Sequence, residues 1–429
     1  MSTQKRNLGK GLMAISPIVV FLAVYLISSI VAKDFYKVPV ASAFLIASAY
    51  AIITTKGSME ERIRIFSDGA ADRNLLLMVW IFIMAGAFAG TAKEIGSVEA
   101  TVNFTLSIIP GKALLAGFFL TSCFVSMAIG TSVGTIVALV PIANGIAAET
   151  GIGAGHMTAI IVGGAFFGDN LSFISDTTIA ATRAMGCAMK DKFKANLKIV
   201  APAVLAVTVI YVIQGIRTDI TTDADAIEWA KLIPYISVIV LAISGMNVIA
   251  VLATGIVINA AVGFMNGIEW FSWLGAIGSG IAGMGDLIVV TLLAGGMLSL
   301  IRYNHGLDII MEVLTRRANG KRGAELCIAA LTSLANLCTA NNTIAIITTG
   351  GISRNIADKF DIDPKRGASL MDTFSCMVQG LIPYGAQLLM ASGLSGLPAT
   401  AIIPYLYYPI AVGIAATLSI VLKRNGRQN

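Results

Sequence analysis

Charged residues are scarce in this sequence. Asp, Glu, Lys and Arg make up only 13% of its 429 residues, while hydrophobic residues make up 56%. A soluble domain usually carries about 25% charged residues, and the mean hydropathy of +0.82 is far above the soluble range. Disordered chains are excluded as well, because they are poor in hydrophobic residues. The composition is typical of a helical membrane protein.

The residues that most enzymes depend on are also sparse. The two histidines and five scattered cysteines show no metal-ligand spacing, and no phosphate-binding Gly-Lys-Ser/Thr loop is present. The glycine pattern at 278–283 follows no strand, so it does not indicate a dinucleotide site. No serine or cysteine has a histidine placed to activate it, and no basic stretch carries interleaved aromatics. We therefore expect no enzyme, no resident cofactor and no nucleic-acid partner.

Continuous apolar runs dominate instead, and they lack the period-two alternation of a membrane β-barrel. Ten helices of about 20 residues would cross a bilayer and leave ample chain for loops. If the N-terminus is inside, these crossings place 24 of the 30 Lys and Arg residues on the cytoplasmic side, in line with the positive-inside rule. The sequence thus predicts a multi-pass protein of the plasma (inner) membrane with both termini cytoplasmic and a retained first helix.

The two halves of the chain resemble each other. Three short matches occur in the same order at nearly one offset: 83–86 with 292–295, 131–136 with 339–344, and 169–171 with 379–381. Internal repeats of this size are typical of secondary transporters. We therefore predict an all-α polytopic fold of two inverted-topology repeats, 1–216 and 217–429. Each would hold about five transmembrane helices and a re-entrant hairpin.

Each half contains a two-armed element with a polar tip, at about 111–149 and 322–356. Each also contains a long interrupted helix, at about 157–186 and 369–392. Backbone that leaves a helix at membrane depth must line a cavity or be buried in protein. The hydroxyls and amides there are candidate substrate ligands, with helix–helix packing as the alternative for the tips: Thr131, Ser132, Thr135, Asn341, Asn342, Thr343, Gln379 and Gln387.

The first interrupted helix also carries two carboxylates within an apolar run. Asp169 and Asp176 stand about two helical turns apart, and glycine and hydroxyl residues favour a break between them. Freed carbonyls and carboxylates suit Na⁺, and carboxylates also take up protons; helix capping is the alternative. Asp286 and Asp372 lie at predicted helix starts, where capping is expected. The predicted ion and proton site comprises Asp169 and Asp176 as Na⁺ ligands with Asn170, Ser172, Ser175 and Thr177.

The stretch 168–178, Gly-Asp-Asn-Leu-Ser-Phe-Ile-Ser-Asp-Thr-Thr, resembles the NhaC-type sodium/proton antiporter family of the ion transporter superfamily. The family pattern reads roughly Gly-Asp-Lys-x-Ser-Pro-x-Ser-Asp-Thr-Thr, so Asn170 replaces a lysine and Phe173 a proline. Residues 341–343 are similar to the Ser-Asn-Thr hairpin tip of dicarboxylate/sodium symporters in that superfamily. The resemblance implies inverted repeats, re-entrant hairpins, an elevator-like movement and a homodimer.

These features together predict sodium/proton antiport across the cell membrane. Asp169 and Asp176 would bind Na⁺ and H⁺ in competition. The alternative is a transporter of the same fold that couples Na⁺ or H⁺ to a small organic solute, either a carboxylate or an amino acid. A channel or a membrane scaffold without transport activity is a third class, which saturable and counter-ion-dependent flux would exclude.

Overall fold

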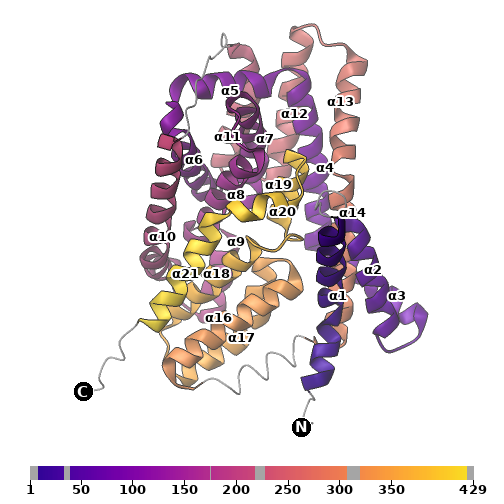
Figure 1. Ribbon diagram of the computed structural model, residues 1–429, viewed down its shortest axis with the longest axis vertical. Coiled ribbons are helices and arrows are strands. Elements are labelled where there is room, and N and C mark those ends of the chain that lie inside the picture. Colours follow the sequence, from indigo (N-terminus) through magenta and orange to yellow (C-terminus); the bar gives the residue numbers. More distant parts are fainter. Residues whose placement is uncertain (1–7, 33–38, 174, 218–227, 307–318, 423–429) are drawn as a thin grey trace.

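The computed structural model describes residues 8–32, 39–173, 175–217, 228–306 and 319–422, and all regular structure within them is helical (Figure 1). Seven helices there are long and apolar enough to cross a membrane, or eight if one bent pair is a single span. The predicted all-α polytopic class is confirmed. The basic residues of 1–7 and 423–429 lie outside the described residues, so the orientation of the termini stays a prediction.

Within its described residues, the first half of the chain forms ten α-helices and one 3₁₀ turn. They are α1 (Leu8–Ala32), α2 (Val40–Thr54), α3 (Met59–Ala70), α4 (Arg73–Glu94), α5 (Ser97–Ile108), η1 (Gly111–Ala113), α6 (Leu114–Ile129), α7 (Ser132–Thr150), α8 (Ala154–Leu171), α9 (Asp176–Met185) and α10 (Met189–Arg217). The pair α6–α7 is the first predicted hairpin. The interrupted helix is α8–α9, in which α8 ends at Leu171 and α9 begins at Asp176.

The second half follows a comparable order. Its described elements are α11 (Trp229–Ile243), α12 (Val248–Met265), α13 (Trp270–Gly283), α14 (Gly285–Tyr303), α16 (Gly320–Thr339), α17 (Asn342–Lys359), α18 (Pro364–Gln379), α19 (Ala386–Ser395), α20 (Ala399–Ile402), η2 (Ile403–Tyr405) and α21 (Tyr407–Val421). The second hairpin is α16–α17, and α18–α19 is the second interrupted helix. In Figure 1, α6 and α7 lie in the upper part and α16 and α17 in the lower part, with α8 and α9 between them.

The two hairpin tips have matching backbone geometry. Gly130 and Ala340 end the first arms in the left-handed conformation, with φ of 76° and 49°. Thr131 and Asn341 then take extended conformations and begin the second arms. These equivalent positions are 210 residues apart, so the sequence offset of 208 for this segment is wrong by two. In the structure, the two tips correspond at the residues where the chain reverses, Gly130 and Ala340. The match between the sequences instead paired residues of the same or similar type.

Hydrogen bonds between each hairpin and its interrupted helix follow the same offset. The Ser126 hydroxyl donates to the Ala165 carbonyl, and the Asn336 amide donates to the Ser375 carbonyl. Both pairs are 39 residues apart, and 126 to 336 and 165 to 375 are each steps of 210. A polar side chain of the first arm therefore ties each hairpin to the helix that bears the break.

Glycines permit the closest helix approaches. Gly86 and Gly90 of α4 lie against Gly280 and Ala276 of α13, with backbone oxygens where a Cβ would stand. Of the glycines in the pattern at 278–283, Gly280 is the one in this contact, whereas Gly278 and Gly283 have open space around them. Small residues at four-residue spacing let membrane helices approach in this way.

Gly168 has the same role beside the predicted ion site, where α6 crosses α8. A Cβ at Gly168 would collide with the side chain and backbone of Ser126. We expect Gly168→Ala to lower the free energy of unfolding by about 1–3 kcal/mol, because overpacking displaces one helix. Thermal unfolding of the purified protein measures this. Gly278→Ala in α13, which has open space around it, is the matched control, and an equal loss in both variants would contradict the packing account.

Candidate functional site

Asp169 lies in the last turn of α8 and is 5% exposed. Both hairpin tips reach its carboxylate. The Ser132 hydroxyl donates to Oδ2 at 2.6 Å and the Ser132 backbone N–H donates to Oδ1 at 3.2 Å. From the other tip, the Asn342 amide donates to Oδ2 at 3.4 Å. A buried carboxylate is tolerated when it is hydrogen-bonded in this manner. Ser132 and Asn342, which are 210 residues apart in sequence, thus meet on one acidic group.

Two glutamines extend this contact into a chain of hydrogen bonds. The Gln387 amide donates to the Ser132 hydroxyl at 2.9 Å, and the Gln379 amide donates to Gln387 Oε1 and to the Ala340 carbonyl, each at 2.9 Å. Gln379 ends α18 and Gln387 begins α19. The break in the second interrupted helix is therefore linked through Ser132 to Asp169, at the break in the first.

The break between α8 and α9 is held by hydroxyls. Thr177 donates to the Asp169 carbonyl at 2.9 Å, and the Ser175 and Thr177 hydroxyls are 2.8 Å apart. Ser175 is the N-cap residue of α9, and Asp176 is the first helical residue. The side chain of Asp176 is exposed. The N-cap position that the alternative interpretation gave to Asp176 is therefore held by Ser175.

A cavity of about 460 Å³ opens over these groups. It is lined by both hairpin tips, by both helix breaks, and by apolar residues of α4 together with residues 246–249 at the start of α12. Among the predicted site residues it is lined by Thr131, Ser132, Asp169, Ser175, Asp176, Thr177, Asn341, Asn342, Thr343, Gln379 and Gln387. Asp169 and Asp176 are the charged residues of this lining, which within the described part of the chain contains no Lys, Arg or His. The lining of the cavity therefore carries negative charge, which suits the binding of a cation.

Three predicted site residues do not line the cavity. Asn170 directs its amide to the Phe166 carbonyl and the Tyr408 hydroxyl. Thr135 bonds back to the Thr131 carbonyl within α7, and Ser172 is buried at the end of α8. Consecutive residues of a helix are turned by about 100° from one another, so neighbours of a ligand in sequence face other helices.

A buried ion pair stands directly behind the break, and the sequence did not predict it. Lys192 of α10 and Asp372 of α18 are 1% and 0% exposed, and Lys192 Nζ lies 2.8 Å from Asp372 Oδ2. The interpretation of Asp372 as a helix cap is wrong, because α18 begins earlier, with Asp363 as its capping residue. Asp286, by contrast, lies exposed in the first turn of α14, whose N-cap residue is Met284.

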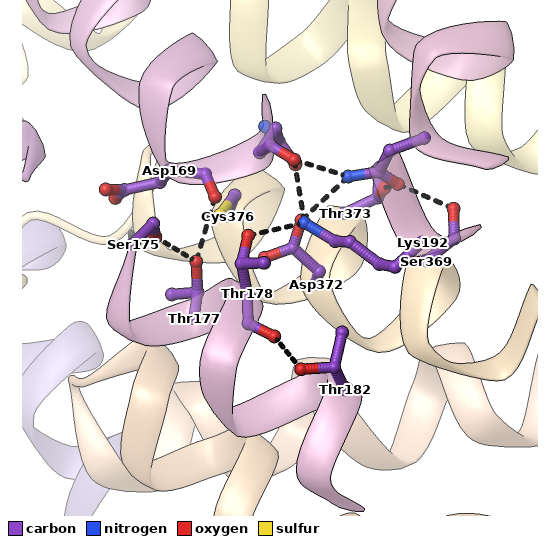
Figure 2. Close-up of polar contacts among 12 residues, drawn as sticks. Asp169, Ser175, Thr177, Thr178, Thr182, Lys192, Ser369, Asp372, Thr373 and Cys376 are labelled. Atoms are coloured by element: carbon purple, nitrogen blue, oxygen red, sulfur yellow. Dashed lines mark hydrogen bonds and ion pairs between the residues drawn. The ribbon is translucent and has the colours of Figure 1, made fainter. Parts of the chain in front are cut away.

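Figure 2 shows how this pair is embedded. The Lys192 ammonium also donates to the Asn170 carbonyl and the Thr178 hydroxyl, each at 2.7 Å. The Asn196 amide donates to Asp372 Oδ2 and to the Asn170 carbonyl, each at 2.8 Å. One signal in the sequence pointed to this arrangement: Lys192 and Asn196 continue the buried helical face of α10 formed by Val200, Ala203 and Val207.

Comparison with known proteins agrees with this architecture. The model of the "Na+/H+ antiporter family" matches residues 8–216 and 227–424, which is nearly the whole chain. The chain belongs to this family. It is therefore a multi-pass secondary transporter of the cell membrane, and the resemblance of residues 168–178 is confirmed at the level of the family.

Three curated relatives to which this chain is similar are named for different substrates. The malate-2H⁺/Na⁺-lactate antiporter of Bacillus subtilis is 24% identical over 80% of this chain and 80% of its own length. The Na⁺/H⁺ antiporter NhaC of Alkalihalophilus pseudofirmus is 24% identical over 77% and 78%. The arginine/ornithine antiporter ArcD of Halobacterium salinarum is 23% identical over 81% and 77%. Among solved structures, the Alcanivorax borkumensis YdaH transporter aligns with a TM-score of 0.43 at 14% identity, covering 95% of this chain and 99% of that chain.

Proposed function

We propose that the protein exchanges Na⁺ for H⁺, and that the Asp169 carboxylate binds the two ions in turn. The observation that carries this is the position of Asp169: 5% exposed, held by both hairpin tips, and on a cavity without a basic residue among its described lining. A buried anion needs a partner or a proton, so Na⁺ and H⁺ are alternatives at one group. Carboxylate, hydroxyl and amide oxygens are hard ligands suited to Na⁺.

The structure suggests a division of roles around this carboxylate. Ser132 and Asn342 hold Asp169, and Asp176, exposed in the cavity, attracts cations toward it. Alternating access then requires that the cavity open to one side of the membrane at a time. We propose that the two hairpins and the two interrupted helices move together as one elevator-like unit against the rest of the protein. Their hydrogen bonds through Asp169 and Gln387 would keep them in register during that movement.

The test of the function is transport by the purified protein in proteoliposomes. An outward or inward Na⁺ gradient should change the internal pH, and an imposed pH gradient should drive uptake of labelled Na⁺. Choline in place of Na⁺ should give no signal. A wild-type protein that moves Na⁺ without any counter-flow of protons would contradict sodium/proton exchange.

Ser132→Ala provides a graded test of the site. The variant removes a hydrogen bond to the ionised carboxylate, a kind of bond worth about 1.5–3 kcal/mol. We therefore expect the apparent Na⁺ affinity to fall by about tenfold or more. Thr135→Ala is the matched control, since that hydroxyl bonds a carbonyl of its own helix. Equal affinities in wild type and Ser132→Ala would argue against the assigned contact.

A small organic solute is the second candidate, favoured by the size and walls of the cavity. Its volume of about 460 Å³ lies in the range of small-molecule sites and far exceeds one ion, and Met78, Ile81 and Val248 give it an apolar side. Two carboxylates without a lining cation favour an amino acid with a basic group over a dicarboxylate. Stabilisation of the protein by such an amino acid, measured with and without Na⁺, separates this candidate from ion exchange alone.

Three further parts of the proposal concern assembly, symmetry and orientation. We propose a homodimer, inverted repeats related at an offset of 210, and cytoplasmic termini. The matching backbone geometry of the two tips supports the repeats, and the distribution of basic residues supports the cytoplasmic termini. Cross-linking in native membranes and labelling of terminal tags from either side test the dimer and the orientation.

A further inference from the structure

We propose that the chain contains a second monovalent-cation site, which the ammonium group of Lys192 permanently occupies. The proposal concerns the oxygen atoms around Lys192 Nζ and does not depend on which ion Asp169 carries. Its centre is the interior side of the α8–α9 break, away from the cavity lining.

The donor set around Lys192 Nζ consists of oxygens of three kinds. The Asn170 carbonyl, the Thr178 hydroxyl and the Asp372 carboxylate lie at 2.7, 2.7 and 2.8 Å. A carbonyl freed at a helix break, a hydroxyl and a carboxylate are the ligands that a hard alkali cation takes in transporters. The ammonium group of Lys192 thus occupies the position that a metal ion would hold.

Burial makes this arrangement a closed site. Asn170 and Asp372 are fully buried, and Thr178 and Lys192 are 2% and 1% exposed. Asn196 fixes two of the three ligands, because its amide donates to both the Asn170 carbonyl and Asp372 Oδ2. Its own oxygen accepts hydrogen bonds from the Ser369 and Thr373 hydroxyls. The Asn170 carbonyl and the Asp372 carboxylate are therefore held in place by a neighbour other than the lysine, as a site for an exchangeable ion requires (Figure 2).

The site lies at the α8–α9 break beside Asp169, and this position links it to transport. The Asn170 carbonyl lies next in sequence to Asp169, and Thr178 lies in the first turn of α9, which begins at Asp176. A cation on these oxygens stabilises the negative end of α8 and fixes both sides of the break. Since Lys192 is covalently attached, this positive charge remains in the protein throughout the cycle, and a free ion is needed only at Asp169.

The test is to remove the tethered cation and supply a free one. Lys192→Ala opens the space and leaves Asp372 without a partner, so thermal stability of the full-length protein should become dependent on NaCl or KCl. The midpoint of unfolding should rise by about 1–3 °C per tenfold increase in cation concentration, with choline chloride as the blank. The size of K⁺ is closer to that of an ammonium group, so the Na⁺ and K⁺ arms identify which ion the oxygens accept.

Two matched variants separate this site from general salt effects. Lys192→Met fills most of the space and should be destabilised without gaining any cation response beyond that of the wild type. Lys192→Ala combined with Asp372→Asn removes the charge of the site and should respond to Na⁺, K⁺ and choline as the wild type does. If Lys192→Ala responds to Na⁺ and K⁺ no more than the wild type does, or yields no folded protein when extracted at about 300 mM of any of the three salts, a saturating concentration for a weak site, the proposal is overturned.

Asp169→Asn distinguishes this inference from the proposed function. In that background the stabilisation by Na⁺ at Asp169 should disappear, and adding Lys192→Ala should create a new cation response. A cation response that persists unchanged in Asp169→Asn alone counts against the sodium site of the proposed function. The response created by Lys192→Ala decides the second site independently.

Discussion

Asp169→Asn is expected to reduce Na⁺-dependent proton flux to the level of empty liposomes. The amide has nearly the same shape and can still accept the Ser132 hydrogen bond. It carries no charge to attract Na⁺ and takes up no proton at neutral pH. Both half-reactions are lost together, because one group serves both. Flux of Na⁺ and flux of H⁺ are measured in the same proteoliposomes.

Two other carboxylates provide the comparison for this variant. Asp176→Asn should weaken Na⁺ affinity while exchange continues, since Asp176 lines the cavity but has an exposed side chain. Asp286→Asn, at the exposed start of α14, should leave exchange unchanged. Retained proton-coupled Na⁺ flux in Asp169→Asn would show that the shared carboxylate lies elsewhere.

Asp372→Asn is expected to have the largest effect on stability. The change leaves the Lys192 ammonium buried without its anion, and breaking one partner of a buried pair typically costs about 3–5 kcal/mol. For a chain of this size we expect the midpoint of thermal unfolding to fall by roughly 5–10 °C. Size-exclusion profiles after heating, or calorimetry of the purified protein, give the midpoint.

Asp361→Asn is the matched control for this prediction. Asp361 also pairs with a lysine, Lys321, but its side chain is fully exposed and the atoms are 3.4 Å apart. Exposed pairs contribute little, and Asn tolerates the positive φ of 50° found there. A midpoint for Asp372→Asn equal to that of the control would mean that the Lys192–Asp372 pair does not stabilise the fold.

The hairpins, the helix breaks and Asp169 could all be predicted from the sequence. The hairpins are visible as paired apolar arms around polar tips. Asp169 stands out because a carboxylate within an apolar run is energetically costly and is usually functional. The reversal at Gly130 follows from the freedom of glycine at positive φ. The equivalent reversal at Ala340 carries no such signal, which is why the match between the halves slipped by two residues.

The position of Lys192 on the apolar face of α10 is a signal in the sequence, but its pairing with Asp372 could not be predicted, because the pairing is a property of the tertiary structure. Its partners are 180 residues apart in sequence, and Lys192 stands among Lys190, Lys194 and Lys198. When basic residues are counted along the sequence, these lysines resemble those of an ordinary cytoplasmic loop. Asn170 shows the opposite relation, because its position beside Asp169 in the sequence is what places it in the predicted ion site. Its side chain instead faces Tyr408 of α21, and its backbone carbonyl faces Lys192.

The central claim, that Na⁺ and H⁺ compete for one carboxylate, is tested most directly by the Na⁺ dependence of exchange at a series of pH values. Competition predicts that the apparent KM for Na⁺ rises as the pH falls, by up to about tenfold per pH unit, while the rate at saturating Na⁺ stays constant. A KM for Na⁺ that does not change with pH, with only the maximal rate responding, would contradict a shared site at Asp169.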